Sequence, residues 1–573
     1  MDFLRDLAQR LPIDEKYLKK VPIPGLQGRC LLEIDLARGL TETSPASPLE
    51  ALRERNTPSL KAVVDGLRKG ADDERVAGLI VHAAAGIGIS QAQELRAAIE
   101  VFRASGKPTV AWSESYGELT QGTVGYLVAC ACEQVWVQPS GDAVLTGFVA
   151  GGLFLRGALD KLDALPQFVK RKEYKSAAET FMNSSMSEPN REMLDQIITS
   201  VNESVTQTIA ASRGLSVAQV QEAFDAGRLG AQQARERGFV DEIGYRDEAL
   251  AALRVRVGAA EDDSELRFVE RYRKAGGGPA AALKRGRPVV AVVQATGPIH
   301  LGRAGGKNPM SGHSVGSDTL GAALRAAARD KAVRALVLRV DSPGGSYVAS
   351  DAIRREVLRV RDAGKPVIAS MGSVAASGGY FIAMPAQRIV ANPATLTGSI
   401  GVLAGKIVVG QSLQRIGVAR EELSHGRFDD MFSQQRPFTD DELTALDEWL
   451  DEVYADFTTK AADDRGMPID QLEPLARGRV WSGADAVAKG LADELGGLDT
   501  ALGLACAAAG FDRDDCEARL MPKLGPLDRL MPTESSESPV AAFGEGPGLF
   551  AQLTSALGLP THGVLTMPDI RIR

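Results

Sequence analysis

Apolar and polar positions along the chain alternate between the pattern of buried strands and the pattern of amphipathic helices. In the front part, ERVAGLIVH (74–82) predicts a strand, SQAQELRAAIEVFRASGK (90–107) a helix and PTVAWS (108–113) a second strand. The same order returns later in KAVRALVLRV (331–340), SDAIRREVLRVRDAGK (350–365) and PVIASM (366–371). Alternating strands and helices predict parallel sheets with crossover helices, and therefore an α/β fold.

The likeness between the two parts extends beyond these elements. YLVACACEQVWVQPSGDAVLTG (126–147) resembles YFIAMPAQRIVANPATLTG (380–398). EAFDAGRLGAQQARERGFVDEIG (222–244) resembles EPLARGRVWSGADAVAKGLADELG (473–496). Similarity sustained over this length predicts a tandem duplication of one βαβ unit.

A chain of 573 residues is too long for one ordinary core, which agrees with several domains. The region between the repeats is rich in Gly, Ala, Pro and charge and predicts a connector, whereas the Ser/Pro/Gly-rich end predicts a largely irregular tail. The predicted organisation is an N-terminal arm (1–28), a first repeat (29–253), a connector (254–287), a second repeat (288–508) and a C-terminal tail (509–573).

Composition narrows the classes of function. The 66 basic and 74 acidic residues give a net charge of -8, and no basic stripe is present, which argues against nucleic-acid binding. An odd number of sparse cysteines is not a disulfide framework, and the scattered histidines predict no zinc site. The five cysteines are Cys30, Cys130, Cys132, Cys506 and Cys516.

No stretch of about twenty apolar residues is present, so the sequence predicts a cytoplasmic protein or one peripheral at the inner membrane. The N-terminus places Phe3, Leu4, Leu7 and Leu11 on one helical face. This face suits contact with a membrane surface, and it equally suits an arm packed on a neighbouring subunit.

The second repeat carries a candidate nucleophile. LVLRVDSPGGS (336–346) ends a buried strand in a glycine loop, and GSVAASGGYFIAMPA (372–386) places Ser377 where a strand ends and a helix begins. The amides of Gly345 and Gly378 are natural donors to an oxyanion beside that hydroxyl. The alternative is a serine that only caps a helix in a Gly-rich turn.

A nucleophilic serine needs a base. No histidine falls at a strand end near Ser377, and His425 in LSHGRFDDMF, the nearest candidate, reads as an exposed loop residue. Lysine serves as a base when burial keeps its amine neutral. FVKRKEYKSAAETFMNSSMS (168–187) offers Lys175, followed by small residues that could enclose it; a surface lysine is the alternative.

The repeats differ in a complementary way. Thr123 stands opposite Ser377, and HAAAGIG (82–88) replaces the glycine loop of the second repeat. Conversely, SHGRFDDMF (424–432) matches the Lys175 segment but carries Arg427 and no lysine. One repeat keeps the base and the other keeps the nucleophile, so a site built from both accounts for the two losses.

At these residues the sequence resembles the signal peptide peptidase A family, also called protease IV, in its long two-repeat form. DSPGGS, AASGGYFIA, LTGSIGV (396–402) and EYKSAAETF carry the resemblance, which covers about 29–508. It implies a fold related to Clp protease and crotonase and a Ser/Lys dyad, with Ser377 as nucleophile and Lys175 as general base. It also implies that Ser399 orients the lysine; the first repeat has Thr146-Gly147-Phe148 at that place.

The resemblance further implies peptide substrates, either cleaved signal peptides or other hydrophobic oligopeptides, and a homo-oligomer, with a tetramer favoured. It implies no metal and no cofactor. Long members commonly begin with a membrane anchor, which this sequence does not show, so a more general oligopeptidase stays open. Two other functions remain: a crotonase-type acyl-CoA hydrolase or isomerase, and an inactive peptidase-like scaffold for a membrane or partner protein.

Overall fold

The computed structural model describes residues 29–43, 56–84, 86–258, 264–274, 287–304, 313–522, 563–568 and 570–572. The chain forms two compact units. Unit 1 comprises Met1–Ser44, Arg53–Gly147 and Val205–Pro288, and unit 2 comprises Pro45–Leu52, Phe148–Ser204 and Val289–Arg573. Residues 148–204, which the sequence assigned to the first repeat, therefore pack within unit 2. The repeat boundaries remain a prediction about the duplication, whereas the two units describe how the folded chain is divided.

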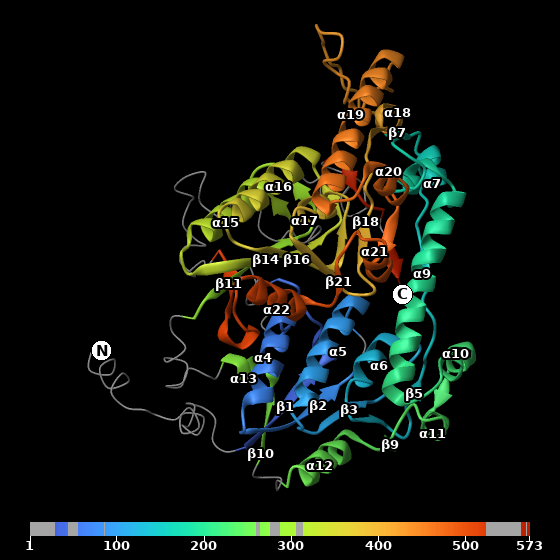
Figure 1. The fold of residues 1–573 in the computed structure, drawn as a ribbon. Coiled ribbons are helices and arrows are strands. Elements are labelled where there is room, and N and C mark those ends of the chain that lie inside the picture. Colours follow the sequence, from blue (N-terminus) through green and yellow to red (C-terminus); the bar gives the residue numbers. More distant parts are fainter. Residues whose placement is uncertain are drawn as a thin grey trace. The chain divides into compact units, whose positions relative to one another are not determined.

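Unit 1 is built on a sheet of six parallel strands in the order β10-β1-β2-β3-β4-β9. Its strands are β1 (Arg29–Asp35), β2 (Val76–His82), β3 (Thr109–Ser113), β4 (Gln134–Val137), β5 (Asp142–Ala143), β8 (Leu229–Gly230), β9 (Glu242–Ile243) and β10 (Ser264–Phe268). Its helices are η1 (Leu36–Arg38), α4 (Leu60–Asp72), α5 (Ile89–Ala104), α6 (Thr123–Ala129), α10 (Val217–Ala226), α11 (Ala231–Glu236), α12 (Arg246–Arg256) and α13 (Val269–Lys274). Helices α4 and α5 cover the face of the sheet opposite to α12 (Figure 1).

Unit 2 contains a larger sheet of eight strands. Six of them are parallel, in the order β22-β11-β14-β16-β17-β21. The other two are β18, which pairs in parallel with β16, and β20, which pairs antiparallel with β18. The sheet strands are β11 (Val289–Thr296), β14 (Val333–Ser342), β16 (Val367–Ala376), β17 (Arg388–Ala391), β18 (Leu396–Gly398), β20 (Val480–Ser482), β21 (Glu494–Leu495) and β22 (Glu517–Met521). The remaining strands are β6 (Ala150–Gly151), β7 (Leu165–Lys170), β12 (Ile299–His300), β13 (Val315–Gly316), β15 (Gly344–Gly345), β19 (Leu403–Val408), β23 (Leu565–Thr566) and β24 (Arg571–Ile572).

The helices of unit 2 include some that cover the two faces of this sheet and others that pack elsewhere in the unit. They are α7 (Arg156–Lys161), α8 (Glu179–Met182), α15 (Ser317–Arg329), α16 (Tyr347–Asp362), α17 (Gly378–Ala383), α18 (Gly410–Arg415), α19 (Asp440–Arg465), α20 (Ile469–Leu472), η3 (Glu473–Leu475), α21 (Gly483–Ala488), α22 (Leu498–Ala508) and η4 (Arg513–Asp515), together with the first part of α9 (Glu188–Arg213). Helices α15, α16 and α17 pack on one face and α22 on the other, and each face has its own apolar core (Figure 1). Because both faces are covered, the central strands are apolar almost throughout.

The predicted α/β class with parallel sheets is confirmed, and so are the six predicted elements. The main difference among them is that β16 continues to Ala376, which takes the strand to the residue before Ser377. The described part of the predicted connector contains α13 and also β10, a strand that the sequence did not predict, which pairs in parallel with β1. The predicted tail likewise supplies β22, β23 and β24, while residues 523–562 and the N-terminal arm lie outside the described residues.

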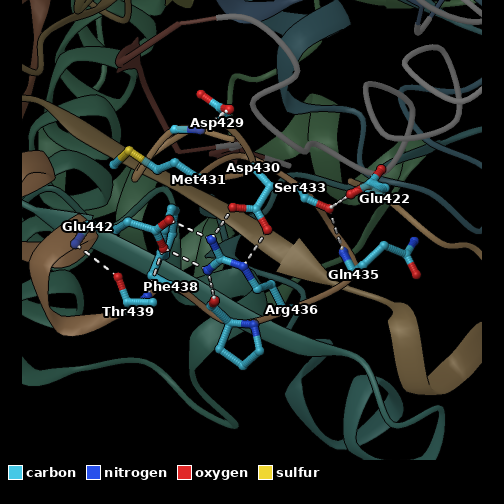
Figure 2. A network of polar contacts seen from close by, with 12 residues as sticks. Glu422, Asp429, Asp430, Met431, Ser433, Gln435, Arg436, Phe438, Thr439 and Glu442 are labelled. Atoms are coloured by element: carbon cyan, nitrogen blue, oxygen red, sulfur yellow. Dashed lines mark hydrogen bonds and ion pairs between the residues drawn. The ribbon is translucent and has the colours of Figure 1, made fainter. Parts of the chain in front are cut away.

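The start of α19 is fixed by a partly buried charge network (Figure 2). Arg436 donates to both carboxylate oxygens of Glu442, at 2.8 and 2.6 Å, and also pairs with Asp430. Glu442 accepts from the backbone N–H of Thr439, the residue that caps the helix. The loop before α19 is thus tied to the first turn of the helix by one guanidinium.

None of the helices among the described residues combines the length and the apolar character needed to cross a bilayer.

Candidate active site

Ser377 lies at the junction between β16 and α17, where the sequence placed it. Its side chain is fully buried, and its φ of 54° falls in the region that side-chain-bearing residues rarely adopt. Ser377 directly follows the last residue of β16 and directly precedes the first residue of α17. Strain of this kind costs about 1–3 kcal/mol and is concentrated at functional sites.

Strand register brings a second serine beside the first. Strands β16 and β18 run parallel with Ala376 opposite Gly398, so Ser377 and Ser399 follow the last paired residues of adjacent strands. The Ser377 N–H donates to the Gly398 carbonyl at 2.8 Å. Ser399 is also fully buried and also has a positive φ, of 50°. Two adjacent parallel strands therefore end in two strained, buried serines.

Lys175 reaches this point from the loop between β7 and α8. Strand β7 pairs antiparallel with β19, which follows Ser399, and this pairing starts at Lys170 opposite Leu403. The Lys175 Nζ lies 2.8 Å from the Ser377 Oγ, 3.1 Å from the Ser399 Oγ and 3.2 Å from the Ser399 carbonyl oxygen. A single chain, and within it unit 2 alone, brings the three predicted residues together.

The electrostatics of the site favour a neutral amine. The Lys175 side chain is completely buried, and burial lowers its pKa well below the ordinary value of 10.5. The three contacts of its Nζ are to two hydroxyls and a carbonyl oxygen, none of which is charged. A neutral lysine amine has a free electron pair and can accept a proton from a hydroxyl within hydrogen-bond distance.

The glycine loop lies against the start of α17. A Cβ built on Gly378 would lie 3.1 Å from the Gly345 nitrogen, and one built on Gly344 would lie 2.6 Å from the Gly378 nitrogen. The two predicted donor amides are therefore close neighbours next to Ser377. A side chain at Gly345 would stand 2.0 Å from the Ile299 carbonyl oxygen, so the loop requires glycine where it passes β12.

The edge of the glycine loop pairs with a segment that is distant in the sequence of the same chain. Strand β23 pairs antiparallel with β15, with Leu565 opposite Gly345 and Thr566 opposite Gly344. On its other side the Val564 carbonyl accepts from the Leu403 N–H at 3.0 Å. The Leu565 side chain is fully buried. An extended segment thus lies between the glycine loop and β19.

Comparison with known proteins identifies the family. Residues 101–260 and 359–511 match the family described as Peptidase family S49. The chain is 34% identical over 461 residues to "Protease 4" of Salmonella typhi, covering 79% of this chain and 72% of that protein. The chain belongs to peptidase family S49.

Two further relatives agree with this assignment. "Serine protease SPPA, chloroplastic" of Arabidopsis thaliana is 33% identical over 451 residues, 78% of this chain and 65% of that protein. "Protease 4" of Haemophilus influenzae is 30% identical over 498 residues, 83% of this chain and 78% of that protein. The chain thus spans slightly less than two thirds of the chloroplastic relative. The S49 protein is a serine peptidase, so family membership gives no support to the acyl-CoA alternative.

Sequence reasoning missed one part of the S49 site. Arg477, Gly478 and Arg479, which precede β20, lie against both Lys175 and Ser399. Their contacts with Lys175 and Ser399 are made mainly by backbone atoms, so the residue types alone give little indication of these contacts. The one available hint was the dipeptide Gly-Arg in LARGRVWSG, within the segment that resembles part of the first repeat, because a glycine falls there just before a strand.

The sequence of the S49 protein also offered histidine and cysteine side chains as candidates. His425 lies exposed in the loop before α19. All five cysteines are buried and none forms a disulfide, and Cys130 and Cys132 closely follow α6. Within the part of the chain that the structure describes, no three His, Cys, Asp or Glu side chains gather closely enough to hold a metal ion.

Proposed function

We propose that the protein is an endopeptidase that uses Ser377 as its nucleophile and Lys175 as its general base. The observation that carries the proposal is the fully buried Lys175 amine 2.8 Å from the Ser377 Oγ. Burial lowers the pKa of the lysine, so a large fraction of the amine is neutral at pH values where an exposed lysine is protonated. Ser399 supports the same arrangement by holding the amine from a second side.

The reaction follows from the placement of these atoms. The neutral Lys175 amine takes the hydroxyl proton of Ser377 as Oγ bonds to the substrate carbonyl carbon. The amides of Gly345 and Gly378 stabilise the oxyanion that forms. The ammonium then protonates the leaving nitrogen as the C–N bond breaks. Water loses a proton to Lys175, attacks the acyl ester and releases the second product, and Ser377 regains its proton.

We propose hydrophobic oligopeptides, cleaved signal peptides among them, as substrates. An extended peptide binds a protein by adding a strand to a free sheet edge, and its alternate side chains enter pockets. The edge of β15 is already paired by β23, whose sequence GVLTM (563–567) is apolar apart from one threonine. That pairing supports binding of an extended, apolar backbone next to Ser377.

We also propose that the two sheets are diverged copies of one ancestral unit. Their parallel strand orders, β10-β1-β2-β3-β4-β9 and β22-β11-β14-β16-β17-β21, correspond strand for strand. The Tyr126 hydroxyl donates to the Phe239 carbonyl at 2.7 Å, and the Tyr380 hydroxyl donates to the Leu491 carbonyl at 2.9 Å. These matching features support the duplication that the sequence similarity suggested.

Labelling with a fluorophosphonate probe, together with hydrolysis of a fluorogenic hydrophobic peptide, tests the dyad. Ser377→Ala is expected to abolish labelling and hydrolysis, and Lys175→Ala is expected to lower kcat by at least about 1,000-fold. Ser433→Ala, which changes a partly buried loop position, and Lys161→Ala, which changes an exposed helix position, serve as controls with wild-type activity. Labelling that persists in Ser377→Ala would remove the nucleophile from the proposal.

Ser399→Ala tests the orienting role separately. The variant removes one hydroxyl contact to the lysine and leaves the contact to the backbone carbonyl. Loss of one such hydrogen bond corresponds to about 1–1.5 kcal/mol, so kcat is expected to fall about tenfold. Wild-type kcat in this variant would show that Ser399 does not orient the amine.

A further inference from the structure

The segment Arg477–Arg479 holds the backbone on both sides of Ser399. The Ser399 N–H donates to the Arg479 carbonyl at 2.7 Å, and the Gly478 N–H donates to the Ile400 carbonyl at 2.7 Å. These two short bonds run in opposite directions between the same two stretches of chain. The position of the Ser399 hydroxyl is therefore set by residues 477–479.

The same segment lies directly against the backbone of Lys175. A Cβ built on Gly478 would lie 2.6 Å from the Lys175 nitrogen, 2.8 Å from its Cα and 2.7 Å from its Cβ. A Cβ built on Gly401 would lie 2.6 Å from the Gly478 Cα and 3.4 Å from the Lys175 Cδ. Gly478 is thus enclosed between Lys175 and the strand end that carries Ser399. No larger residue fits there without moving one of them.

Ion pairs fix the flanks of this contact. The Arg477 guanidinium donates to both oxygens of Glu173, at 2.7 and 2.9 Å, and to Glu473 at 3.2 Å. The hydrogen bonds from Arg477 hold the pKa of Glu173 below its usual value. Lys172 in turn pairs with Glu473 at 3.3 Å. The loop that presents Lys175 is therefore bound to Arg477 directly through Glu173 and indirectly through Lys172 and Glu473.

We propose that Arg477, Gly478 and Arg479 form a positioning segment that sets the distance between the Lys175 amine and the Ser377 hydroxyl. The inference rests on the proposed dyad and adds residues beyond Ser377, Lys175 and Ser399. It holds because one three-residue stretch fixes both the lysine backbone and the serine that orients the lysine. A lysine side chain has four rotatable bonds, so its tip is only as well placed as its backbone and its contacts.

The dyad is sensitive to small displacements. A shift of about 1 Å in a reacting group costs about 100-fold in rate. A methyl group at position 478 would require a displacement of this order, since it would lie under 3 Å from three Lys175 atoms. A displaced amine would also meet more water or polar backbone, and its protonated form would then be favoured.

Gly478→Ala with Gly510→Ala as control tests the proposal. Both glycines have a φ of +79°, but nothing lies within 4 Å of a Cβ built on Gly510. Backbone strain is therefore matched, and only Gly478→Ala presses on Lys175. We expect Gly478→Ala to lower kcat about 100-fold with KM changed less than threefold, and to move the acidic limb of the kcat profile to higher pH. Equal kcat and equal pH profiles in the two variants would overturn the proposal.

Glu173→Gln provides a second variant that keeps the fold if Gly478→Ala fails to fold. Glu173 is 37% exposed in its pair with Arg477, and the matched control is Glu494→Gln, which is 40% exposed in its pair with Arg388. We expect Glu173→Gln to lower kcat about threefold to tenfold and to shift the acidic limb in the same direction. Identical pH profiles for Glu173→Gln, Glu494→Gln and the unchanged protein would also overturn the proposal.

Failure of this inference differs from failure of the dyad. If Ser377→Ala or Lys175→Ala keeps full activity, the dyad itself is wrong. If both lose activity while Gly478→Ala and Glu173→Gln behave like their controls, the dyad stands and only the positioning role is wrong.

Discussion

At the scale of single residues, the site gathers features that work against folding. Ser377 and Ser399 both hold positive φ angles, and Lys175 is buried without a carboxylate partner among the three contacts of its amine. Each strained backbone position costs about 1–3 kcal/mol. The buried amine adds the free energy of releasing its proton on folding. Such costs persist only where the surrounding core over-determines the geometry.

Lys175→Met should therefore stabilise the folded protein at neutral pH while abolishing peptidase activity. Because the folded pKa of Lys175 is lowered, the unfolded chain binds one more proton than the folded chain between that pKa and about 10.4. The unfolding free energy of the unchanged protein should then rise with pH by up to about 1.4 kcal/mol per unit relative to the variant. Urea unfolding at pH 7, 8 and 9 measures the difference. A difference in unfolding free energy between the two proteins that does not narrow with rising pH would contradict a neutral buried amine.

The sequence predicted these residues unevenly, for physical reasons. Ser377 and Lys175 could be found because each repeat lacks what the other retains. Ser399 came from resemblance, since a serine in a Thr-Gly-Ser turn has no distinctive pattern of its own. Gly478 was not found, because its role is a backbone contact with a residue some three hundred positions away and the local sequence offers only a weak hint of it.

At the scale of elements, long apolar strands were predictable and short edge strands were not. Strands β14 and β16 are buried on both faces and read as continuous apolar runs. The edge strands β10 (SELRF) and β22 (EARLM) are short and carry charge, so their sequences resemble linker and tail. Their pairing depends on the edges of the neighbouring β1 and β11, which local sequence does not encode.

The pairing of β23 with β15 leads to an element-scale prediction. A peptide that adds to the edge of the glycine loop must take the place of residues 563–567. A covalently attached segment competes at high effective concentration. Deletion of residues 563–573 is expected to raise kcat/KM for a peptide about threefold or more, mainly through a lower KM. Loss of activity and of probe labelling on deletion would show instead that the segment is a wall of the site.

The Arg436 network at the start of α19 leads to a second prediction at the scale of elements (Figure 2). Hydrogen bonds from Arg436 lower the pKa of Glu442 from 4.5 to about 2. The stabilisation is complete above about pH 4.5 and is lost as the pH falls from there toward 2. Arg436→Met is expected to lower the unfolding free energy by about 1–3 kcal/mol at pH 7 and by less at pH 3. Urea unfolding of both proteins at the two pH values measures this, and an equal loss at both would contradict it.

At the scale of the whole molecule, the site belongs to one compact unit assembled from separated stretches of chain. Residues 148–204 deliver Lys175, and residues after 289 deliver Ser377 and its loop. The sequence suggested two repeats that meet at a site. The compact units differ from that division because β7 pairs with β19, the strand that follows Ser399, and so joins the lysine loop to the part of the chain that carries the nucleophile.

Mixing two inactive variants tests whether one chain completes its own site. Ser377→Ala lacks the nucleophile and Lys175→Ala lacks the base, and the structure supplies both groups from a single chain. A mixture of the two purified proteins, unfolded and refolded together, is expected to show no more activity than either alone. Recovery of a quarter or more of the wild-type rate would mean that subunits exchange these groups.

The separation of base and nucleophile along the chain also has a consequence for synthesis. Lys175 and Ser377 lie 202 residues apart, and translation adds about 5–20 residues per second. For roughly 10–40 s after the lysine is made, the growing polypeptide has no serine for it to activate. The nascent chain therefore cannot cleave itself or a neighbouring protein with this dyad until Ser377 has been made.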